Sequence, residues 1–274
     1  MPLNLSTLSL TKSNLIDNFI KSPLSVLDKI NLELQRAVSH LLFVVLGPVF
    51  SFIVFRKFKI RILELKAIRQ KYRELLTNSD NGNNGPILIC SNHLTYVDSI
   101  IQTIAVSSVF GHLLRPSRMA WHLPEKSNFA HKPLWRLICY LGKCIPVIRS
   151  GTKEETKRVT NKMQYVLGRG DVISIFPEGK RSKNGRLDTE RFSYAVGQIL
   201  KGHENCRVLC IFMRDKDKEH NAYSVFPRKD ADYCFDMELL TPTSNMKGLR
   251  KAKDLSTQVM MKLKEMEDSF FSEK

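Results

Sequence analysis

Short apolar runs and longer stretches of helical periodicity alternate along the middle of the chain. Apolar runs of four or five residues that end at turn-forming residues suit buried strands, and residues with a 3.6-residue period suit helices packed on a sheet. This alternation predicts an α/β domain with a central, largely parallel sheet flanked by helices. The predicted strands lie near residues 87–90, 172–176 and 208–212, and the predicted helices near 98–110, 132–140 and 152–167.

The last fifty residues contain two further patterns. Residues 223–240 hold two short alternating runs, which are typical of a hairpin at the edge of a sheet. Beyond them, apolar residues recur at helical spacing among Lys and Glu, so a final amphipathic helix is expected to pack on the domain. Its apolar positions are Leu249, Leu255, Val259, Leu263 and Met266.

The longest uncharged stretch covers nineteen residues, 37–55. A helix that spans a bilayer needs about 20 apolar residues, and Gly47-Pro48 at the centre disfavours one straight helix. We therefore expect an apolar helical hairpin that enters one leaflet and returns. One kinked span and a buried pair of core helices are the alternatives. Because Arg36 precedes the stretch and Arg56 follows it, both ends are expected on the cytoplasmic face of the membrane.

The chain after this stretch suggests a division into domains. Residues 57–76 predict a basic amphipathic helix on the membrane surface, and the Asn- and Gly-rich residues 78–85 predict a linker. We therefore expect a membrane-associated helical region at 1–77, a linker at 78–85 and an α/β domain at 86–274. The first thirty-six residues lack the pattern of a cleavable signal peptide.

Charge and cysteine content narrow the choice of partners. The chain carries 43 Lys and Arg against 27 Asp and Glu, a net charge of +16, which would attract anionic lipid headgroups, phosphorylated substrates, an acidic carrier protein or nucleic acid. It has no recognisable basic-aromatic module, so no nucleic-acid partner is expected. The cysteines form no C-x-x-C pair and lie near no zinc-type His spacing, so no metal site is predicted and the thiols are expected to be reduced. They are Cys90, Cys139, Cys144, Cys206, Cys210 and Cys234.

One segment, residues 90–98, sets His93 five positions ahead of Asp98 at the end of a predicted strand. On a single helix or strand these side chains would point in different directions. If His93 lies in the turn after the strand and Asp98 in the first turn of the next helix, the carboxylate can accept from one ring nitrogen. The other nitrogen is then free to take a proton from a hydroxyl. The alternative is a capping Asp beside a loop His.

A second segment, residues 175–182, also follows an apolar run. Pro177 cannot continue a central strand and Gly179 permits positive φ, so the strand is expected to end in a turn. This turn would bring Glu178, Lys180 and Arg181 to one place.

Together the two segments resemble motifs of the glycerolipid acyltransferase family, whose best known members are 1-acylglycerol-3-phosphate acyltransferases. Residues 92–98 match the family's N-H-x4-D block. Residues 176–182 match its F-P-E-G-T-R-S block, with Lys180 in place of Thr. Residues 142–149 look like the second block, and residues 207–212 resemble the fourth block without its Pro. The resemblance covers residues 85 to 215.

The resemblance implies a membrane-bound O-acyltransferase. The donor would be a thioester of coenzyme A or of acyl carrier protein, with no other cofactor. The acceptor would be a lysophospholipid at an anionic membrane surface, and the expected reaction converts 1-acylglycerol-3-phosphate to phosphatidic acid. Another acceptor, such as a lyso-ornithine lipid, is an alternative. So is a noncatalytic basic membrane-binding protein with the same fold, although such a protein would be expected to lose His93 or Asp98.

The resemblance also implies roles for single residues. His93 would be the general base, and Asp98 would orient it. Arg149 and Arg181 match positions linked to acceptor binding, with help from Lys180 or Lys143. Glu178 is expected to order these arginines or to contact a glycerol hydroxyl, and Gly179 to supply turn geometry.

Overall fold

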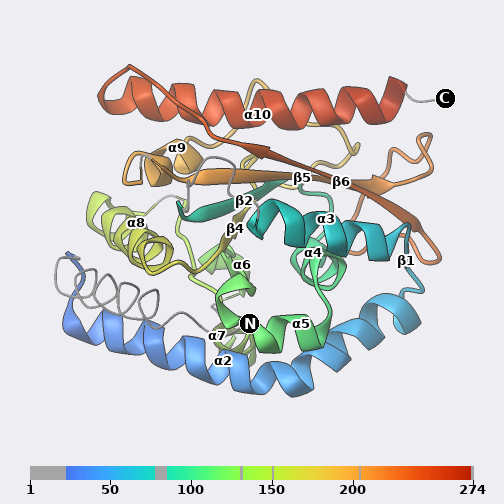
Figure 1. The fold of residues 1–274 in the computed structure, drawn as a ribbon, viewed down its shortest axis with the longest axis horizontal. Helices are drawn as coiled ribbons and strands as arrows, with labels where there is room; N and C mark the ends of the chain where they lie inside the picture. Colours follow the sequence, from blue (N-terminus) through green and yellow to red (C-terminus); the bar gives the residue numbers. More distant parts are fainter. Residues whose placement is uncertain (1–22, 78–84, 130–131, 150, 204, 273–274) are drawn as a thin grey trace.

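The computed structural model describes residues 23–77, 85–129, 132–149, 151–203 and 205–272, and its centre is a six-stranded sheet (Figure 1). The strand order is β1-β6-β5-β2-β4-β3. Strands β5, β2, β4 and β3 are parallel neighbours, β6 is antiparallel to β5, and β1 is parallel to β6. The predicted α/β class with a largely parallel sheet is confirmed. The strands are β1 (Arg61–Ile62), β2 (Ile87–Ser91), β3 (Trp121–His122), β4 (Ile173–Ile175), β5 (Arg207–Asp215) and β6 (Asp232–Leu240).

Helices cover both faces of the sheet. Successive strand residues point to opposite faces, so Leu88 and Cys90 of β2 contribute to one core and Ile89 to the other. Helices α8 (Lys153–Gly168), α9 (Ala195–Leu200) and α10 (Gly248–Ser272) supply side chains to the first core, and α3 (Leu65–Thr77) and α4 (Asp98–Val106) to the second. Because both faces are buried, the central strands are continuous apolar runs rather than alternating ones.

A long N-terminal helix, α2 (Val26–Phe52), continues for one π-helical turn, η1 (Ile53–Lys57). The predicted hairpin is wrong, because α2 passes through Pro48 without reversing. One Pro removes a single backbone donor and kinks a helix whose other bonds remain. Gly47 serves close packing: a Cβ there would lie 2.8 Å from a methyl carbon of Val109. By length and composition alone, the segment Val26–Lys57 is able to cross a membrane.

The amphipathic helix predicted from residue 57 begins later. Lys59 and Glu64 have positive φ angles, which interrupt the helix, and β1 lies between them. Helix α3 then buries Ile68 and Tyr72 in the core beside α4 instead of lying free along a membrane. Of the predicted linker, only Gly85 lies inside the described residues. Strands from both sides of it share one sheet, and the division of the chain at residues 78–85 stays a prediction.

The hairpin predicted at residues 223–240 is also wrong. This region forms one strand, β6, which lies second from the edge with β1 outside it. The preceding residues form a loop whose backbone bonds to other loops: the Tyr223 amide donates to Lys183 O (2.7 Å), and Val225 O accepts from the Tyr96 amide (3.0 Å). Because of these bonds, the residues before β6 do not form a second strand of a hairpin with it.

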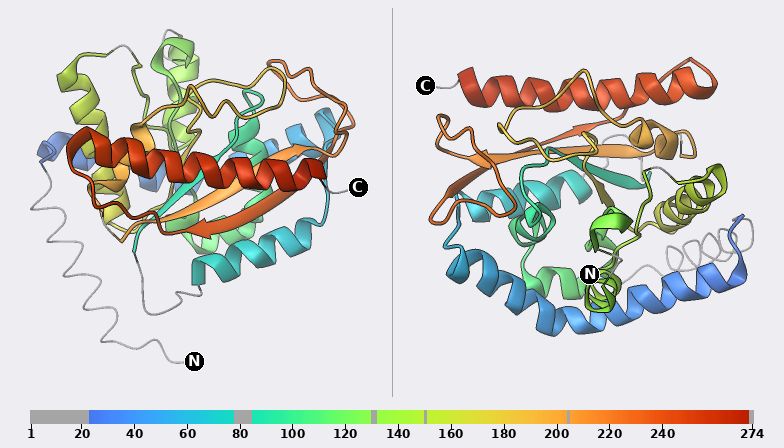
Figure 2. Two further views of the ribbon diagram at one scale, coloured as in Figure 1. Left: turned by 90° about the horizontal axis from the view of Figure 1, so that it is seen from above. Right: turned by 180° about the vertical axis from the view of Figure 1, so that it is seen from behind.

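Helix α10 matches its predicted role, because Leu255, Val259, Leu263 and Met266 lie in the core, although Leu249 at its start is exposed. Helices α2 and α10 lie on opposite sides of the molecule (Figures 1 and 2). The helix predicted at 98–110 is split into α4 and α5 (Val109–Leu114), since Ser108 caps α5 by accepting from the Gly111 amide. The other helical segments are η3 (Pro116–Arg118), α6 (Lys126–Phe129) and α7 (Pro133–Leu141).

Candidate functional site

The two segments selected from the sequence meet at the carboxyl edge of the parallel strands. His93 follows β2 and Glu178 follows β4, and these strands are parallel neighbours in register. Asn92 fixes the turn between β2 and His93. Its amide nitrogen donates to Met213 O (2.8 Å), and its amide oxygen accepts from the Met213 amide (2.9 Å). This pair of bonds ties the turn to β5.

His93 and Asp98 form the pair that their spacing predicts. His93 Nδ1 lies 2.9 Å from Asp98 Oδ2, and Asp98 is the first residue of α4. The fully buried carboxylate also accepts from the amides of Leu94 (2.5 Å) and Thr95 (2.8 Å) and from Thr95 Oγ1 (2.6 Å). These donors compensate for burial of its charge. The His93 ring stacks on Phe176, with centroids 4.0 Å apart.

This arrangement leaves one nitrogen of His93 available. A carboxylate only accepts, so its bond to Nδ1 favours the tautomer with the proton on Nδ1 and a lone pair on Nε2. Within the described part of the chain, Nε2 has no hydrogen-bond partner. The His93 side chain is 17% exposed, so a substrate hydroxyl is able to reach it. The geometry is that of a general base held by a carboxylate.

Glu178 contacts His93 rather than the arginines that we expected it to order. Its Oε1 accepts from the His93 amide (3.0 Å), and its buried Oε2 has no hydrogen-bond partner among the described residues. Burial raises the pKa of the Glu178 carboxyl to about 8, although the backbone amides of His93 and Asp188 oppose this shift. The charge of Glu267 adds to the increase. Glu178 is therefore mostly protonated at neutral pH.

The rest of the 176–182 segment places two cations at the same edge. The Arg181 guanidinium lies 4.0 Å from the centroid of the Tyr96 ring and donates to Ser224 O (2.9 Å). Lys180 pairs with Asp188 (2.8 Å) and remains half exposed. The turn itself depends on Gly179, whose φ of +66° is in the left-handed region that favours glycine.

A backbone bond joins this turn to the turn that carries His93. The Ser182 amide donates to His93 O (2.7 Å). A separate contact reaches the segment from the last helix, because Glu267 of α10 accepts from the Leu187 amide (2.9 Å). Both contacts hold the 176–188 segment against its neighbours.

Arg149 lies on the β3 side of the site. Its Nε is 3.0 Å from Glu125 Oε2, and its amide donates to Glu125 Oε1 (3.5 Å). Val147 bridges to Glu125 just beyond β3, which fixes this segment beside the carboxyl edge. Within the described residues, Arg149 forms no ion pair or hydrogen bond with the His93 group. Its side chain is 59% exposed and open to a ligand.

Lys143 does not belong to the site, contrary to the expectation that it would assist phosphate binding. Its ammonium is fully buried and donates to Pro116 O (3.1 Å) and Met119 O (2.6 Å). Burial lowers the pKa of Lys143 to about 8, and nearby Asp171 opposes this shift. The sequence identified Lys143 as a cation but did not predict that its side chain is buried.

Three residues of this edge carried no signal in the sequence. Glu125 orients Arg149, Asp188 pairs with Lys180, and Tyr96 lies under Arg181. Glu125 and Asp188 lie in loops without periodicity. Tyr96 lies inside the His93–Asp98 interval, at a position that the motif leaves open. Contacts between distant loops, rather than local patterns, identify all three.

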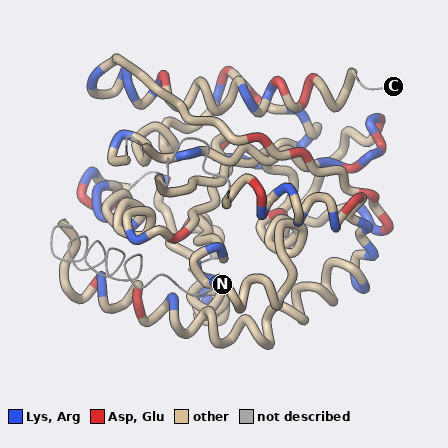
Figure 3. Tube along the Cα trace, in the orientation of Figure 1, with Lys and Arg blue, Asp and Glu red and all other residues tan. Residues whose placement is uncertain are grey.

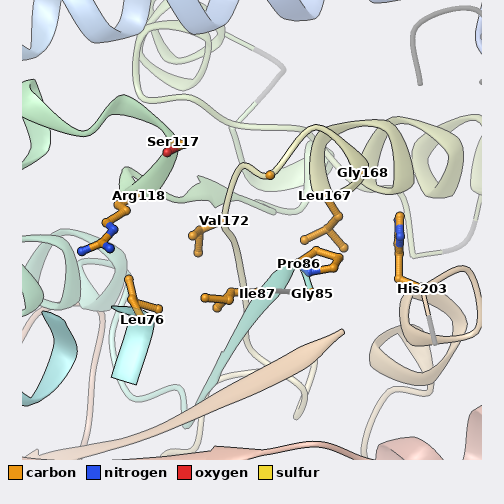
Figure 4. A pocket seen from close by; sticks show the side chains of 11 residues that line it. Leu76, Gly85, Pro86, Ile87, Ser117, Arg118, Leu167, Gly168, Val172 and His203 are labelled. Atoms are coloured by element: carbon orange, nitrogen blue, oxygen red, sulfur yellow. The ribbon is translucent and has the colours of Figure 1, made fainter. Parts of the chain in front are cut away.

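A cavity of about 320 Å³ lies elsewhere, at the amino ends of β2 and β4 (Figure 4). This is the edge of the sheet opposite to His93. Its position excludes it as the space in which His93 would act. The lining residues are Leu76, Gly85, Pro86, Ile87, Ser117, Arg118, Leu167, Gly168, Gly170, Val172 and His203.

The cysteines form no disulfide among the described residues. All six cysteines are free, and Cys90, Cys206 and Cys210 are buried. The described residues contain no group of three or more His, Cys, Asp or Glu that could hold a metal ion.

Comparison with known proteins agrees with this site. No curated protein matches the chain. A family model described as Acyltransferase matches residues 68–214, more than half of the chain. The matched region contains the His93–Asp98 pair, Arg149 and the turn with Glu178 and Arg181. It ends before α10 and begins after α2. The chain therefore belongs to the acyltransferase family.

Proposed function

We propose that this acyltransferase moves a fatty acyl group from a thioester to the hydroxyl of 1-acylglycerol-3-phosphate and so makes phosphatidic acid. The observation that carries the proposal is the His93–Asp98 pair, with Nδ1 held at 2.9 Å and Nε2 open. Loss of either residue would be expected in a noncatalytic relative, and both are present in the correct geometry.

The proposed reaction needs no covalent intermediate on the enzyme. Nε2 of His93 takes the proton of the acceptor hydroxyl as its oxygen attacks the thioester carbonyl, and Asp98 stabilises the imidazolium. The tetrahedral intermediate then collapses: the carbon–sulfur bond breaks, the new ester remains, and the thiolate leaves with the proton from His93. Stacking on Phe176 and the bond to Asp98 fix the ring plane throughout.

A phosphorylated acceptor is supported by the cations around His93. Arg149 and Arg181 are each oriented by a neighbour, Glu125 and Ser224, and a planar guanidinium suits phosphate oxygens. Lys180 adds a point charge where family members carry Thr. A protonated Glu178 adds no negative charge near the phosphate, which removes the repulsion that a carboxylate would cause.

The location that we propose is the cytoplasmic face of a membrane rich in anionic lipids. The acceptor is a lipid, the net charge is +16, and one apolar N-terminal helix is long enough to anchor the chain. The donor is a thioester of coenzyme A or of acyl carrier protein, and the following assay distinguishes the two.

The test is an assay of purified protein with both donors against 1-acylglycerol-3-phosphate, 1-acylglycerophosphocholine and a lyso-ornithine lipid. We expect the phosphate monoester to be the preferred acceptor. His93→Ala should lower turnover by about 10²–10⁴-fold. His203→Ala, which alters a histidine at the opposite edge, should retain turnover. Full activity of folded His93→Ala would disprove the mechanism. Preference for lyso-ornithine lipid would show that 1-acylglycerol-3-phosphate is not the acceptor.

A second assay tests the phosphate site. Arg149→Ala and Arg181→Ala should each raise KM for the phosphorylated acceptor by about tenfold or more, because a charge-assisted hydrogen bond contributes ~1.5–3 kcal/mol. KM for the donor should change little. Lys71→Ala, at an ion pair with Asp236 in which both side chains are about half exposed, is the control. Equal acceptor KM values in the unmodified protein, the two arginine variants and the control would mean that neither arginine binds the phosphate.

A further inference from the structure

Helix α2 differs from a helix of a soluble domain, because its polar side chains Asp28, Gln35 and Ser39 are buried, together with Leu32 and Phe43, while its outward side is apolar. Asp28 accepts from Arg158 (2.8 and 2.9 Å), and Gln35 donates to Tyr140 O (3.1 Å). Ser39, one turn further along, also donates to Tyr140 O (3.0 Å). These contacts satisfy the polar groups of α2 inside the protein.

The ion pair between Arg36 and Asp171 continues this polar side. Asp171 is 1% exposed and lies before β4, in the body of the domain. Further along, Phe43 packs edge-on against the His112 ring, and Gly47 lies against Val109. Contacts with the domain thus extend from Asp28 to Gly47, over most of the helix.

The outward side of α2 is apolar. Leu27 is 79% exposed, Leu41 70% and Phe52 62%, at the start, the middle and the end of the helix. A soluble monomer rarely exposes such a continuous apolar strip. The other exposed members of the strip are Val26, Ile30, Leu34, Leu42, Val44, Val45 and Val49.

Two short helices in contact with α2 extend this surface. Helix α5 exposes Phe110 and Leu114, and helix α7 exposes Leu134, Leu137 and Ile138. Figures 1 and 2 show both helices beside α2, on the side of the molecule opposite to α10. We call the outward residues of α2, α5 and α7 the apolar face.

We propose that the apolar face lies on one leaflet of a lipid bilayer, with α2 parallel to the membrane plane rather than across it. A spanning α2 would have to leave the domain or carry it into the hydrocarbon. The first change would leave Asp28, Arg36 and Gln35 in lipid without partners, and the second would bring the charged surface of the domain into hydrocarbon; both are costly. With α2 in the plane, each of these bonds is kept and the apolar strip is covered.

Charge favours lipid over a second copy of the chain as the occupant. Exposed basic residues flank the apolar face at the helix ends, and α5 and α7 contain no acidic residue. Two such faces would repel each other, whereas anionic headgroups would be attracted. The basic residues are Arg56, Lys57, Arg115, Lys132 and Arg136.

This inference deepens the membrane location given under the proposed function and rests on it. It does not depend on which acceptor is acylated. Binding and chemistry are therefore measured separately.

Tryptophan depth tests the orientation. Trp121 is buried in the core and Trp135 is exposed on α7, so Trp135→Phe provides a background with one buried tryptophan. In it, Ile30→Trp, Leu41→Trp and Phe52→Trp place reporters along the outward side of α2. The 22 residues between the end positions extend about 33 Å in a helix, close to the ~30 Å hydrocarbon core.

Vesicles of phosphatidylcholine and phosphatidylglycerol, brominated at defined depths, then quench each reporter. An in-plane helix gives the same shallow depth at all three positions, and Trp135 in the unmodified chain is quenched as well. The greatest depth at Leu41→Trp, with both ends shallow, would mean a span and would overturn the proposal. Absence of quenching at every position would also overturn it.

A charge variant tests the face itself. Leu41→Glu with Val45→Glu should weaken vesicle binding by at least about 100-fold, because each lost apolar burial contributes severalfold to tenfold or more. Met261→Glu, at a 55% exposed position of α10, should bind as the unmodified chain does. Unchanged binding of the double variant would refute the proposal. So would a lipid-free dimer that this variant abolishes while vesicle binding stays the same.

Activity on a short-chain lysolipid dissolved as monomers separates the two proposals. The double variant should keep acyl transfer to this acceptor while losing vesicle binding. If no variant transfers acyl groups but binding follows the pattern above, the proposed function fails and the membrane face stands. If transfer is normal but binding never depends on the apolar face, the reverse holds.

Discussion

The two longest helices of this acyltransferase are amphipathic in opposite senses. Helix α10 buries Leu255, Val259 and Leu263 in the core and alternates Lys and Glu on its outer side, whereas α2 buries polar groups and exposes apolar ones. Figure 3 shows the contrast: α10 is marked by charges of both signs along its length, while the middle of α2 carries none.

The difference shows that burial of apolar surface alone does not explain how both helices are held on the domain. Helix α10 gains from removal of apolar surface from water, which is the usual source of packing energy. Helix α2 is attached by hydrogen bonds and ion pairs as well as by buried Leu32 and Phe43, and the domain does not remove its outward apolar side chains from water. In water, the apolar side of α10 is already covered by the domain. The apolar side of α2 is covered only in the membrane that we propose.

The largest expected effect concerns the polar attachment of α2. Asp171→Asn removes the partner of Arg36 and leaves buried Lys143 without its nearby carboxylate. Loss of one partner of a buried charge pair costs about 3–5 kcal/mol. Urea unfolding in nonionic detergent should show this loss. A loss below ~1 kcal/mol would mean that α2 is held mainly by its apolar contacts.

Paired leucine substitutions sharpen the comparison. Leu263→Ala in α10 should lower the free energy of unfolding by about 2–5 kcal/mol, because it leaves a cavity in the core. Leu41→Ala on the outside of α2 should change it by less than ~0.5 kcal/mol. The same urea experiment measures both. Similar losses in the two variants would show that the outer side of α2 is packed against protein.

A smaller effect is expected from acid at the start of α2. Arg158 and Lys162 lower the pKa of Asp28 from 3.8 to about 2, against the opposing effect of burial. A carboxyl with a lowered pKa stabilises the fold above its unfolded value, and this contribution is lost as pH falls from about 3.8 to about 2. Protection of the first turns from hydrogen exchange, corrected for the intrinsic pH dependence of exchange, should therefore fall over this range.

Asp28→Asn is the control for this acid effect. It should show low protection in these turns already at pH 5 and little further change in protection down to pH 2. A fall in protection of equal size in the variant would mean that another carboxyl is responsible. Helix α10 is expected to respond less, because its buried side is mostly apolar.

A pH effect of opposite sign is expected where α10 meets the site. The pKa of Glu178 is raised to about 8, so the folded chain binds this proton more tightly than the unfolded chain. Stability should thus fall as pH rises from about 4.5 to about 8, and Glu178→Gln should flatten this slope. Glu267→Gln removes a nearby negative charge, so the slope should end at lower pH. An unchanged end point would exclude coupling between the two carboxyls.

The sequence by itself determined the features that depend on local order. The apolar runs predicted the central strands, the periodicity after residue 248 predicted α10, and the spacing of His93 and Asp98 predicted their pairing across a strand–helix turn. Each of these depends on residues close together in the chain, where strand and helix geometry leaves few arrangements.

Only the tertiary structure decided which distant segments meet. It placed β1 outside β6, buried Lys143 away from the site and oriented Arg149 through Glu125. It also kept α2 as one helix and turned its few polar residues inward. An apolar segment has the same sequence whether it faces a core or a membrane. Which side of the segment faces the protein depends on the partners that bind its polar groups. These partners lie more than a hundred residues away in the chain.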